Sequence, residues 1–292
     1  MASEVELLSL VLTLRPLAAG AGQASLGRAA HAVLLDAIRA ADPALAEQLH
    51  AGSGLRPFTA SNLVGYSPRR GLRPERTYGL RFTTLTGPVA RALLAAAQPG
   101  GPLSVGAVVR LDENELRVEG VADQPKAHPW AAALSYEALS APWLLGRAAP
   151  EPRLALHFAS PATFKSGGLH VPAPLPGLVF GGLLERWNAF APVALPAETR
   201  RFVDECLALT AYRLSTRMVM VKEGGLRAGA VGEARYTAVN HDRYWLSLLN
   251  LLADFALFAG VGAGTSMGLG QVRRVGASTG RPARQPEASD DV

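Results

Sequence analysis

The pattern of apolar and polar positions predicts alternating strands and helices in the first half of the chain. Residues 5–15 alternate in the manner of a strand with one buried face. Residues 26–41 repeat apolar side chains at helical spacing, and Asp42-Pro43 supplies an N-cap and a first-turn proline for a second helix. The predicted elements are a strand at 5–15, helices at 26–41 and 42–52, strands at 58–66 and 76–84, a helix at 87–98, and a strand or hairpin at 105–121.

The second half repeats this order. Its predicted elements are a strand at 153–159, a helix at 176–190, hairpin strands at 209–221 and 230–239, a helix at 243–258 and a strand at 269–275. Each half therefore follows the β-α-β-β-α-β order that is typical of a ferredoxin-like, or RRM-like, unit. The sequence predicts an α+β protein with two tandem domains of this kind, at residues 1–125 and 152–275, together with a linker region at 126–151 and a disordered tail at 276–292.

Composition places the chain among cytosolic globular proteins. Its 292 residues suit two domains, and 49% of them are hydrophobic. Cys206 is the only cysteine, which excludes a disulfide framework and fits a reducing compartment. The first residues are acidic where a signal peptide is basic, and the longest apolar stretch, 244–258, is too short to span a bilayer. We therefore expect a cytoplasmic protein with no membrane partner.

The positive charge is concentrated in one connection. The chain carries a net charge of +5, and the segment between the two strands predicted at 58–66 and 76–84 holds a cluster of arginines with a single acid, Glu75. These arginines are Arg69, Arg70, Arg73 and Arg76. A local basic cluster of this kind is suited to contact phosphates.

Five glycines within eleven residues follow the last predicted helix, at positions 260, 262, 264, 268 and 270. Positions without a Cβ allow backbone N–H groups to surround a phosphate chain. The segment lacks the Gly-Lys-Ser/Thr of a Walker loop, and it follows a helix, whereas a dinucleotide-binding fingerprint follows a strand. A loop lying on a nucleic-acid backbone and a tight turn without a ligand both stay open.

Histidine is the residue type best placed for catalysis. No histidines stand at metal-ligand spacing and no carboxylates cluster, so the sequence favours metal-independent acid–base chemistry with no cofactor. His50 falls in the last turn of the predicted second helix, whose carbonyl end favours a protonated imidazole, and Glu47 precedes it by three residues. Arg56 follows within loop reach, where it can stabilise charge on a phosphorane-like transition state. A simple C-capping role for His50 is the alternative. His31, in the preceding helix, is a second candidate.

Several stretches resemble the CRISPR-associated repeat-processing endoribonucleases of the RAMP superfamily. They are 46–61, which contains Leu-His50 and Arg56-Pro-Phe-Thr-Ala-Ser, 158–164, 177–186 and the glycine-rich 260–272. The resemblance implies tandem ferredoxin-like domains and metal-independent cleavage of CRISPR precursor RNA within its repeats. The products would carry a 2′,3′-cyclic phosphate and a 5′-hydroxyl.

The resemblance also implies roles for individual residues. His50 matches the catalytic histidine of some family members, and Arg56 matches a supporting basic residue. Leu35 stands where some members have a tyrosine, so His31, one helical turn earlier, is the candidate for that role. The RNA backbone would contact the glycine-rich loop, namely Gly262, Gly264, Thr265, Ser266, Gly268 and Gly270.

Two other functions are consistent with these patterns. A non-catalytic RNA-binding subunit of a CRISPR effector complex would share the glycine-rich loop. A duplicated ferredoxin-like protein that binds a phosphorylated metabolite would share the fold, although the basic connection at 69–76 argues against it. Whether the chain forms a homodimer or associates with an effector complex is left open by the sequence.

Overall fold

The first half of the chain folds as a ferredoxin-like unit. The computed structural model describes residues 4–276 with the exception of 24, 53, 147–148 and 221–224. The elements of this half are β1 (Leu7–Pro16), α1 (Gly27–Ala41), α2 (Pro43–Ala51), β2 (Phe58–Ala60), β3 (Tyr78–Leu85), α3 (Gly87–Ala97), β4 (Val108–Leu111) and β5 (Asn114–Ala122). The strands run in the order β2-β3-β1-β5-β4, and every pairing along this path is antiparallel. This is the split β-α-β arrangement with β4 added at one edge.

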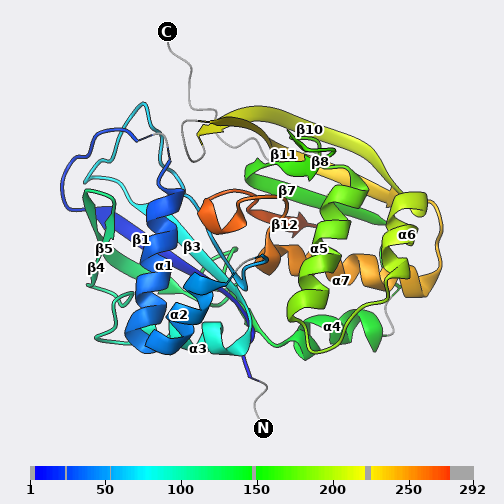
Figure 1. Cartoon of the computed structure of the whole chain (residues 1–292), viewed down its shortest axis with the longest axis horizontal. Coiled ribbons are helices and arrows are strands. Elements are labelled where there is room, and N and C mark those ends of the chain that lie inside the picture. The colour runs from blue at the N-terminus through cyan, green and yellow to red at the C-terminus, as the bar shows by residue number, and fades with distance from the viewer. Residues whose placement is uncertain (1–3, 24, 53, 147–148, 221–224, 277–292) are drawn as a thin grey trace.

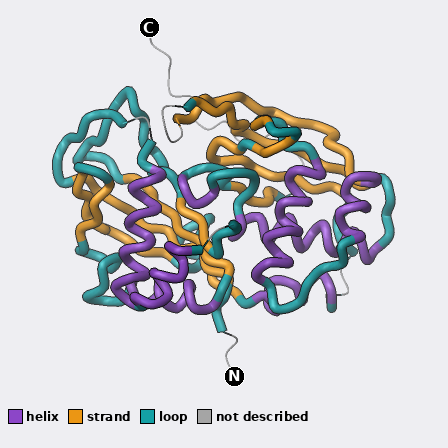
Figure 2. Tube along the Cα trace, viewed as in Figure 1, coloured by secondary structure: helices purple, strands orange, loops and turns teal. Residues whose placement is uncertain are grey.

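The second half repeats the arrangement with longer strands. Its elements are β7 (Arg153–Ala162), a small hairpin of β8 (Phe164–Ser166) and β9 (Leu169–Val171), α5 (Pro176–Phe190), α6 (Glu198–Cys206), β10 (Leu207–Met220), β11 (Leu226–Ala238), α7 (Arg243–Ala259) and β12 (Val272–Val275). The sheet order β10-β11-β7-β12 is again antiparallel throughout. The predicted α+β fold with tandem ferredoxin-like units is confirmed, and in both halves helices gather on one side of the sheet (Figures 1 and 2).

Strand alternation places one face of β1 in the core and leaves the other for the site. Leu8, Leu10 and Leu12 are buried in the cluster that packs against α1 and α3. Ser9 points to the opposite face of the same strand because successive side chains alternate. The open face of this sheet therefore carries the polar side chains that meet the second unit.

Arg81 joins the two units through a buried polar network. Its side chain is only 4% exposed, and its Nε donates to Ser9 Oγ at 2.8 Å. One terminal nitrogen donates to the Gln271 side chain and the other to the carbonyl of Leu257, near the C-terminus of α7. Among the described residues no carboxylate forms an ion pair with Arg81, and the carbonyl end of α7 supplies the compensating negative potential. Burial, followed by the charge of Arg273, lowers the pKa of Arg81 to about 9.

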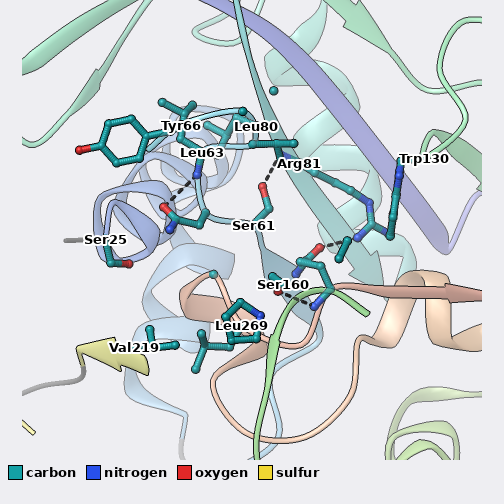
Figure 3. Close-up of a pocket in the computed structure, with 18 of the residues that line it drawn as sticks. Ser25, Ser61, Leu63, Tyr66, Leu80, Arg81, Trp130, Ser160, Val219 and Leu269 are labelled. Carbon is teal, nitrogen blue, oxygen red and sulfur yellow. Dashed lines mark hydrogen bonds between the residues drawn. The ribbon is translucent and has the colours of Figure 1, made fainter. Parts of the chain in front are cut away.

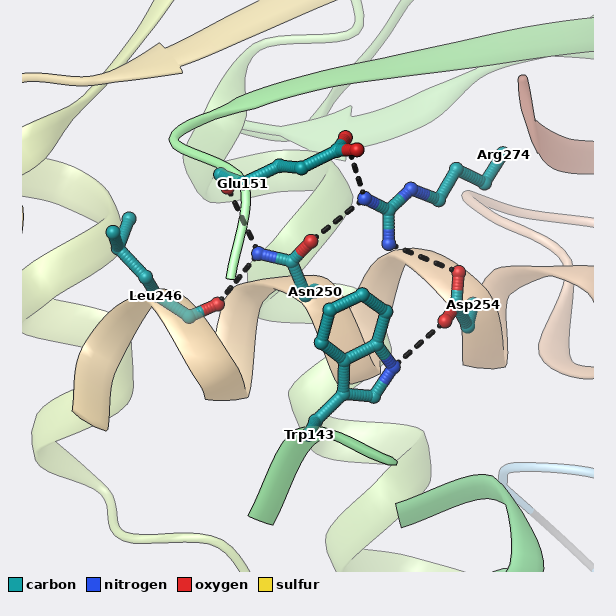
Figure 4. A network of polar contacts seen from close by, with 6 residues as sticks. All are labelled: Trp143, Glu151, Leu246, Asn250, Asp254 and Arg274. Carbon is teal, nitrogen blue, oxygen red and sulfur yellow. Dashed lines mark hydrogen bonds and ion pairs between the residues drawn. The ribbon is translucent and has the colours of Figure 1, made fainter. Parts of the chain in front are cut away.

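A second polar network fixes the start of the C-terminal unit (Figure 4). Arg274 on β12 donates to Glu151 at 3.0 Å, to Asp254 at 3.2 Å and to Asn250 at 2.7 Å. The indole N–H of Trp143 donates to Asp254 at 2.7 Å. Asn250 and Asp254, both within the apolar stretch at 244–258, are therefore bonded to β12, and Asn250 also donates to the carbonyl of Glu151, before β7. No helix of the described residues is long and apolar enough to cross a bilayer.

The segment predicted as a linker contains regular structure. β6 (Ala132–Leu134) pairs with β1, and α4 (Tyr136–Leu144) packs against α7, so this segment contacts both units. The hydroxyl of Ser135 caps α4 by accepting from Ala138 N at 3.0 Å, although Pro142 lies within the helix. The predicted tail at 276–292 lies outside the described residues apart from Gly276.

Candidate active site and glycine-rich loop

The five glycines of the loop after α7 all have left-handed backbone conformations, with φ between 62° and 94°. At two of these positions a side chain would also collide with the protein itself. A Cβ at Gly262 would lie 2.3 Å from the carbonyl oxygen of Thr163, and one at Gly270 would lie 2.0 Å from that of Val261. The N–H groups of Ala263 and Gly270 donate to carbonyls of residues 163 and 161. Internal packing thus explains the absence of side chains, whether or not a ligand also lies on the loop.

The glycine-rich loop docks on the N-terminal unit. Gly268 N donates to Ala60 O at 2.9 Å, and Ser61 pairs with Gly268 in an isolated parallel bridge. Gly27, the first residue of α1, packs so closely that a Cβ there would lie 2.2 Å from Met267 O. β2 ends at Ala60 and not at the predicted residue 66, because after Ser61, which pairs with both Arg81 and Gly268, the described chain pairs with β3 only through an isolated bridge between Val64 and Gly79.

The side chain of His31, on α1, contacts the glycine-rich loop. Its Nδ1 lies 3.1 Å from the carbonyl oxygen of Ser266, and its ring centroid lies 5.5 Å from that of Phe58. Because a carbonyl oxygen only accepts, Nδ1 must carry the proton, and the neutral ring keeps its lone pair on Nε2. Burial lowers the pKa of His31, the hydrogen bond to Ser266 opposes this, and the charges of Arg56 and His50 lower it again. His31 is therefore a neutral base with a fixed tautomer at neutral pH.

His50 lies at the C-terminus of α2, as expected from the sequence. Asp42 caps the start of this helix by accepting from Leu45 N at 2.9 Å, and Pro43 occupies its first turn. The side chain of His50 is exposed, and no hydrogen bond to Glu47 is present among the described residues. Arg56 donates to the carbonyl of Leu49, which fixes the guanidinium beside the last turn of α2. The charges of His50 and Arg56 thus act on His31, and His31 contacts the glycine-rich loop.

The comparisons with known proteins support one family. The family model for the CRISPR-associated endoribonuclease Cas6 matches residues 156–272. A solved Cas6 product complex has 27% sequence identity and a TM-score of 0.74, and the match covers 92% of this chain and 99% of that chain. This chain is similar to the Cas6 endoribonucleases, through the family model in its C-terminal part and through the fold over both units.

Further solved structures extend the likeness over both units. A Cas6 from Thermus thermophilus has 25% identity and a TM-score of 0.70, with 94% of this chain and 100% of that chain covered. The product of a Cas6-related gene from Pyrococcus furiosus, at 14% identity and a TM-score of 0.60, shares the fold over 93% of this chain and 100% of its own. A sequence comparison with curated proteins finds no match.

The basic connection of this chain is exposed on the N-terminal unit. Arg69, Arg70, Arg73 and Arg76 are all exposed in the segment between β2 and β3, and Arg73 makes a 3.9 Å ion pair with Glu75. Arg81, which continues the same basic run in the sequence, is instead buried between the units. The distribution of charge along the sequence does not show which of these arginines are exposed and which is buried.

Two features of the site were not evident from the sequence. The residue that orients His31 is Ser266, through its backbone carbonyl, and carbonyl groups leave no signal in a side-chain pattern. The side chain of Leu35 is 9% exposed and packs in the core of the N-terminal unit, away from a role in the site. Among the described residues no three His, Cys, Asp or Glu side chains cluster as metal ligands would.

Proposed function

We propose that this chain cleaves CRISPR precursor RNA within its repeats by attack of a ribose 2′-hydroxyl on the adjacent phosphate. The observation that carries the proposal is the fixed tautomer of His31, held by Ser266 O beside Arg56 and His50. The match of residues 156–272 to the Cas6 endoribonuclease model supports RNA cleavage, and similar solved structures at 27% identity are Cas6 product and substrate-mimic complexes. The chemistry below needs no metal ion.

His31 acts as the general base in this mechanism. Its Nε2 removes the proton of the 2′-hydroxyl, and O2′ then attacks phosphorus to form a pentacoordinate transition state. Because burial keeps His31 neutral at pH 7, most of the enzyme holds the base in its reactive form.

His50 acts as the general acid. As the bond from phosphorus to O5′ breaks, His50 gives its proton to O5′, and the products carry a 2′,3′-cyclic phosphate and a 5′-hydroxyl. Arg56 stabilises the negative charge that develops on the non-bridging oxygens, because its guanidinium is anchored at Leu49 O and keeps further N–H groups for the phosphate. A general acid or base, the role given to His50 and to His31, contributes roughly 10²–10⁴-fold to the rate.

The repeat RNA is bound by two surfaces, one on each unit, whose residues lie far apart in the sequence. Arg69, Arg70, Arg73 and Arg76 are the exposed cations suited to its phosphates. Residues 262–270 of the glycine-rich loop, including Thr265 and Ser266, supply backbone close to the scissile linkage because the same loop positions His31. This arrangement assigns RNA affinity mainly to the arginines and reactivity to the histidines.

The test is cleavage of repeat RNA in the presence of EDTA, with analysis of both new ends. The proposal predicts a cyclic phosphate and a 5′-hydroxyl for the wild type. His50→Ala should slow cleavage by about 10²-fold or more and leave RNA affinity within about twofold, since an exposed histidine carries little of the phosphate attraction. His241→Ala, at another exposed histidine, serves as the matched control and should cleave normally. Loss of wild-type cleavage in EDTA, or normal cleavage by His50→Ala, would contradict the proposal.

A further inference from the structure

A cavity of about 370 Å³ lies apart from the proposed catalytic residues. It opens on the free face of the N-terminal sheet and is bounded by β3, the segment after β2, the end of the glycine-rich loop and the end of β10 (Figure 3). None of His31, His50 and Arg56 lines it. The volume is at the small end of the roughly 300–1,000 Å³ found for small-molecule sites, so it suits one nucleotide and excludes a duplex.

The side-chain oxygens of this cavity already accept hydrogen bonds from the protein. Asn62 Oδ1 accepts from two backbone N–H groups, at 3.0 and 2.9 Å. Ser61 Oγ accepts from the backbone N–H of Arg81 at 2.9 Å, and Ser160 Oγ accepts from that of Gln271, also at 2.9 Å. Because backbone N–H groups only donate, the orientation of the Asn62 amide is fixed and its NH₂ group faces away from these bonds.

The groups of these residues that remain for a ligand are hydrogen-bond donors. The hydroxyl hydrogens of Ser61 and Ser160 and the amide hydrogens of Asn62 have no acceptor among the described residues. His128 Nδ1 accepts from Trp130 N at 3.2 Å, so the neutral ring carries its proton on Nε2. Burial and the charges of Arg81 and Arg273 lower the pKa of His128 and keep the ring neutral.

The charged side chains that line the cavity also favour a ligand that accepts hydrogen bonds. Arg217, near the end of β10, and Arg81 both line the cavity, and among the described residues no aspartate or glutamate does. A cavity with this composition selects a guest rich in acceptors and negative charge. Among nucleobases, guanine presents two adjacent acceptors, O6 and N7, whereas adenine presents a donor beside N7. Proteins commonly read unpaired RNA bases through these edges.

We propose that this cavity, the donor pocket, receives one unpaired nucleotide of the bound RNA and prefers guanine to adenine. The base acceptors meet the N–H and O–H groups of Asn62, Ser61 and Ser160, and the phosphate lies near Arg217. The inference rests on the proposed function because the ligand is the repeat RNA. It adds recognition of one RNA base, which the catalytic residues do not supply.

The first experiment locates the nucleotide. Repeat RNA with a 2′-deoxy substitution at the scissile ribose is bound to the full-length protein, and each unpaired position is replaced in turn by photoreactive 6-thioguanosine. Crosslinks from one position to peptides that contain Ser61–Asn62 or Arg217 are expected. Absence of such crosslinks at every position would overturn the proposal.

The second experiment measures selectivity at that position. Guanine should bind about tenfold more tightly than adenine, and inosine, which keeps O6 and N7, should match guanine. Asn62→Asp retains the acceptor for both backbone bonds and removes the donor, so it should abolish the preference for guanine. Arg217→Met should weaken binding of all bases alike, and Arg213→Met, on the same strand but outside the pocket, is its matched control.

Equal binding of guanine and adenine by the wild type, or an unchanged preference in Asn62→Asp, would overturn the proposal. Because the RNA is uncleavable, these results do not depend on catalysis. A guanine preference in a protein that fails to cleave repeat RNA would refute the proposed function and leave the donor pocket supported. Saturable binding of free guanosine monophosphate, with no dependence of RNA binding on the base, would assign the pocket to a free nucleotide and overturn its role in RNA recognition.

Discussion

Replacing Gly27 by alanine should slow RNA cleavage by about 100-fold without unfolding the protein. A Cβ on this residue would lie 2.2 Å from the oxygen and 2.6 Å from the carbon of the Met267 carbonyl. Non-bonded carbon atoms rest about 3.5 Å apart or more, so the glycine-rich loop must retreat by about 1 Å. The carbonyl of Ser266, one residue earlier, holds His31 and moves with the loop.

The size of the effect follows from this displacement. A misplacement of about 1 Å in a group that orients a catalytic residue can cost roughly 100-fold in rate. The loss of one hydrogen bond costs about 1 kcal/mol, which is small beside the roughly 5–15 kcal/mol by which proteins are stable, so the variant should stay folded.

The assay is single-turnover cleavage of repeat RNA, with RNA affinity and thermal unfolding measured on the same samples. Gly182→Ala in α5 is the matched control, since a Cβ at that helical glycine meets no atom within 4 Å. The control should cleave at the wild-type rate. A Gly27→Ala variant that also cleaves at the wild-type rate would refute the argument that loop docking positions His31.

Three further predictions follow from the same structure. Because the pKa of His31 is lowered from its usual 6.5, the acid limb of the pH–rate profile should lie below pH 6.5, where falling pH protonates the ring and activity is lost, and His31→Gln should remove this limb. Arg81→Met should lower the free energy of unfolding in urea by about 3–5 kcal/mol, because it abolishes several charge-assisted hydrogen bonds between the units; a change below about 1 kcal/mol would contradict this role. Arg70→Met should weaken RNA binding without changing the single-turnover rate at saturation, and the slope of log affinity against log salt should fall by about one if Arg70 contacts a phosphate.

The fold was predictable because periodicity and caps are local. The helix at 176–190 was predicted with the bounds that α5 has, and the Asp42-Pro43 signal marks the start of α2. α4 and α6 were missed for identifiable reasons. Pro142 within α4 looks like a linker residue, and α6 is a short, mostly polar helix that buries only Thr199, Phe202 and Val203.

The candidate site residues can be named from the sequence, but their assembly in space cannot. The candidate histidines and the glycine-rich loop are visible in the sequence, but His31 and Ser266 are 235 residues apart and meet only because the two units dock. The burial of Arg81 likewise depends on α7 of the other unit. Such contacts are set by tertiary packing, which no local pattern encodes.

The assignment of the two histidines is tested most directly with a leaving group that needs no proton. Repeat RNA with sulfur in place of the scissile O5′ releases a thiolate, which is stable without general acid catalysis because thiols are far more acidic than alcohols. On ordinary RNA, both His50→Ala and His31→Ala should be slow. On the sulfur-substituted RNA, His50→Ala should recover nearly the wild-type rate and His31→Ala should stay slow. Failure of the sulfur substitution to rescue His50→Ala would contradict the role of His50 as the acid.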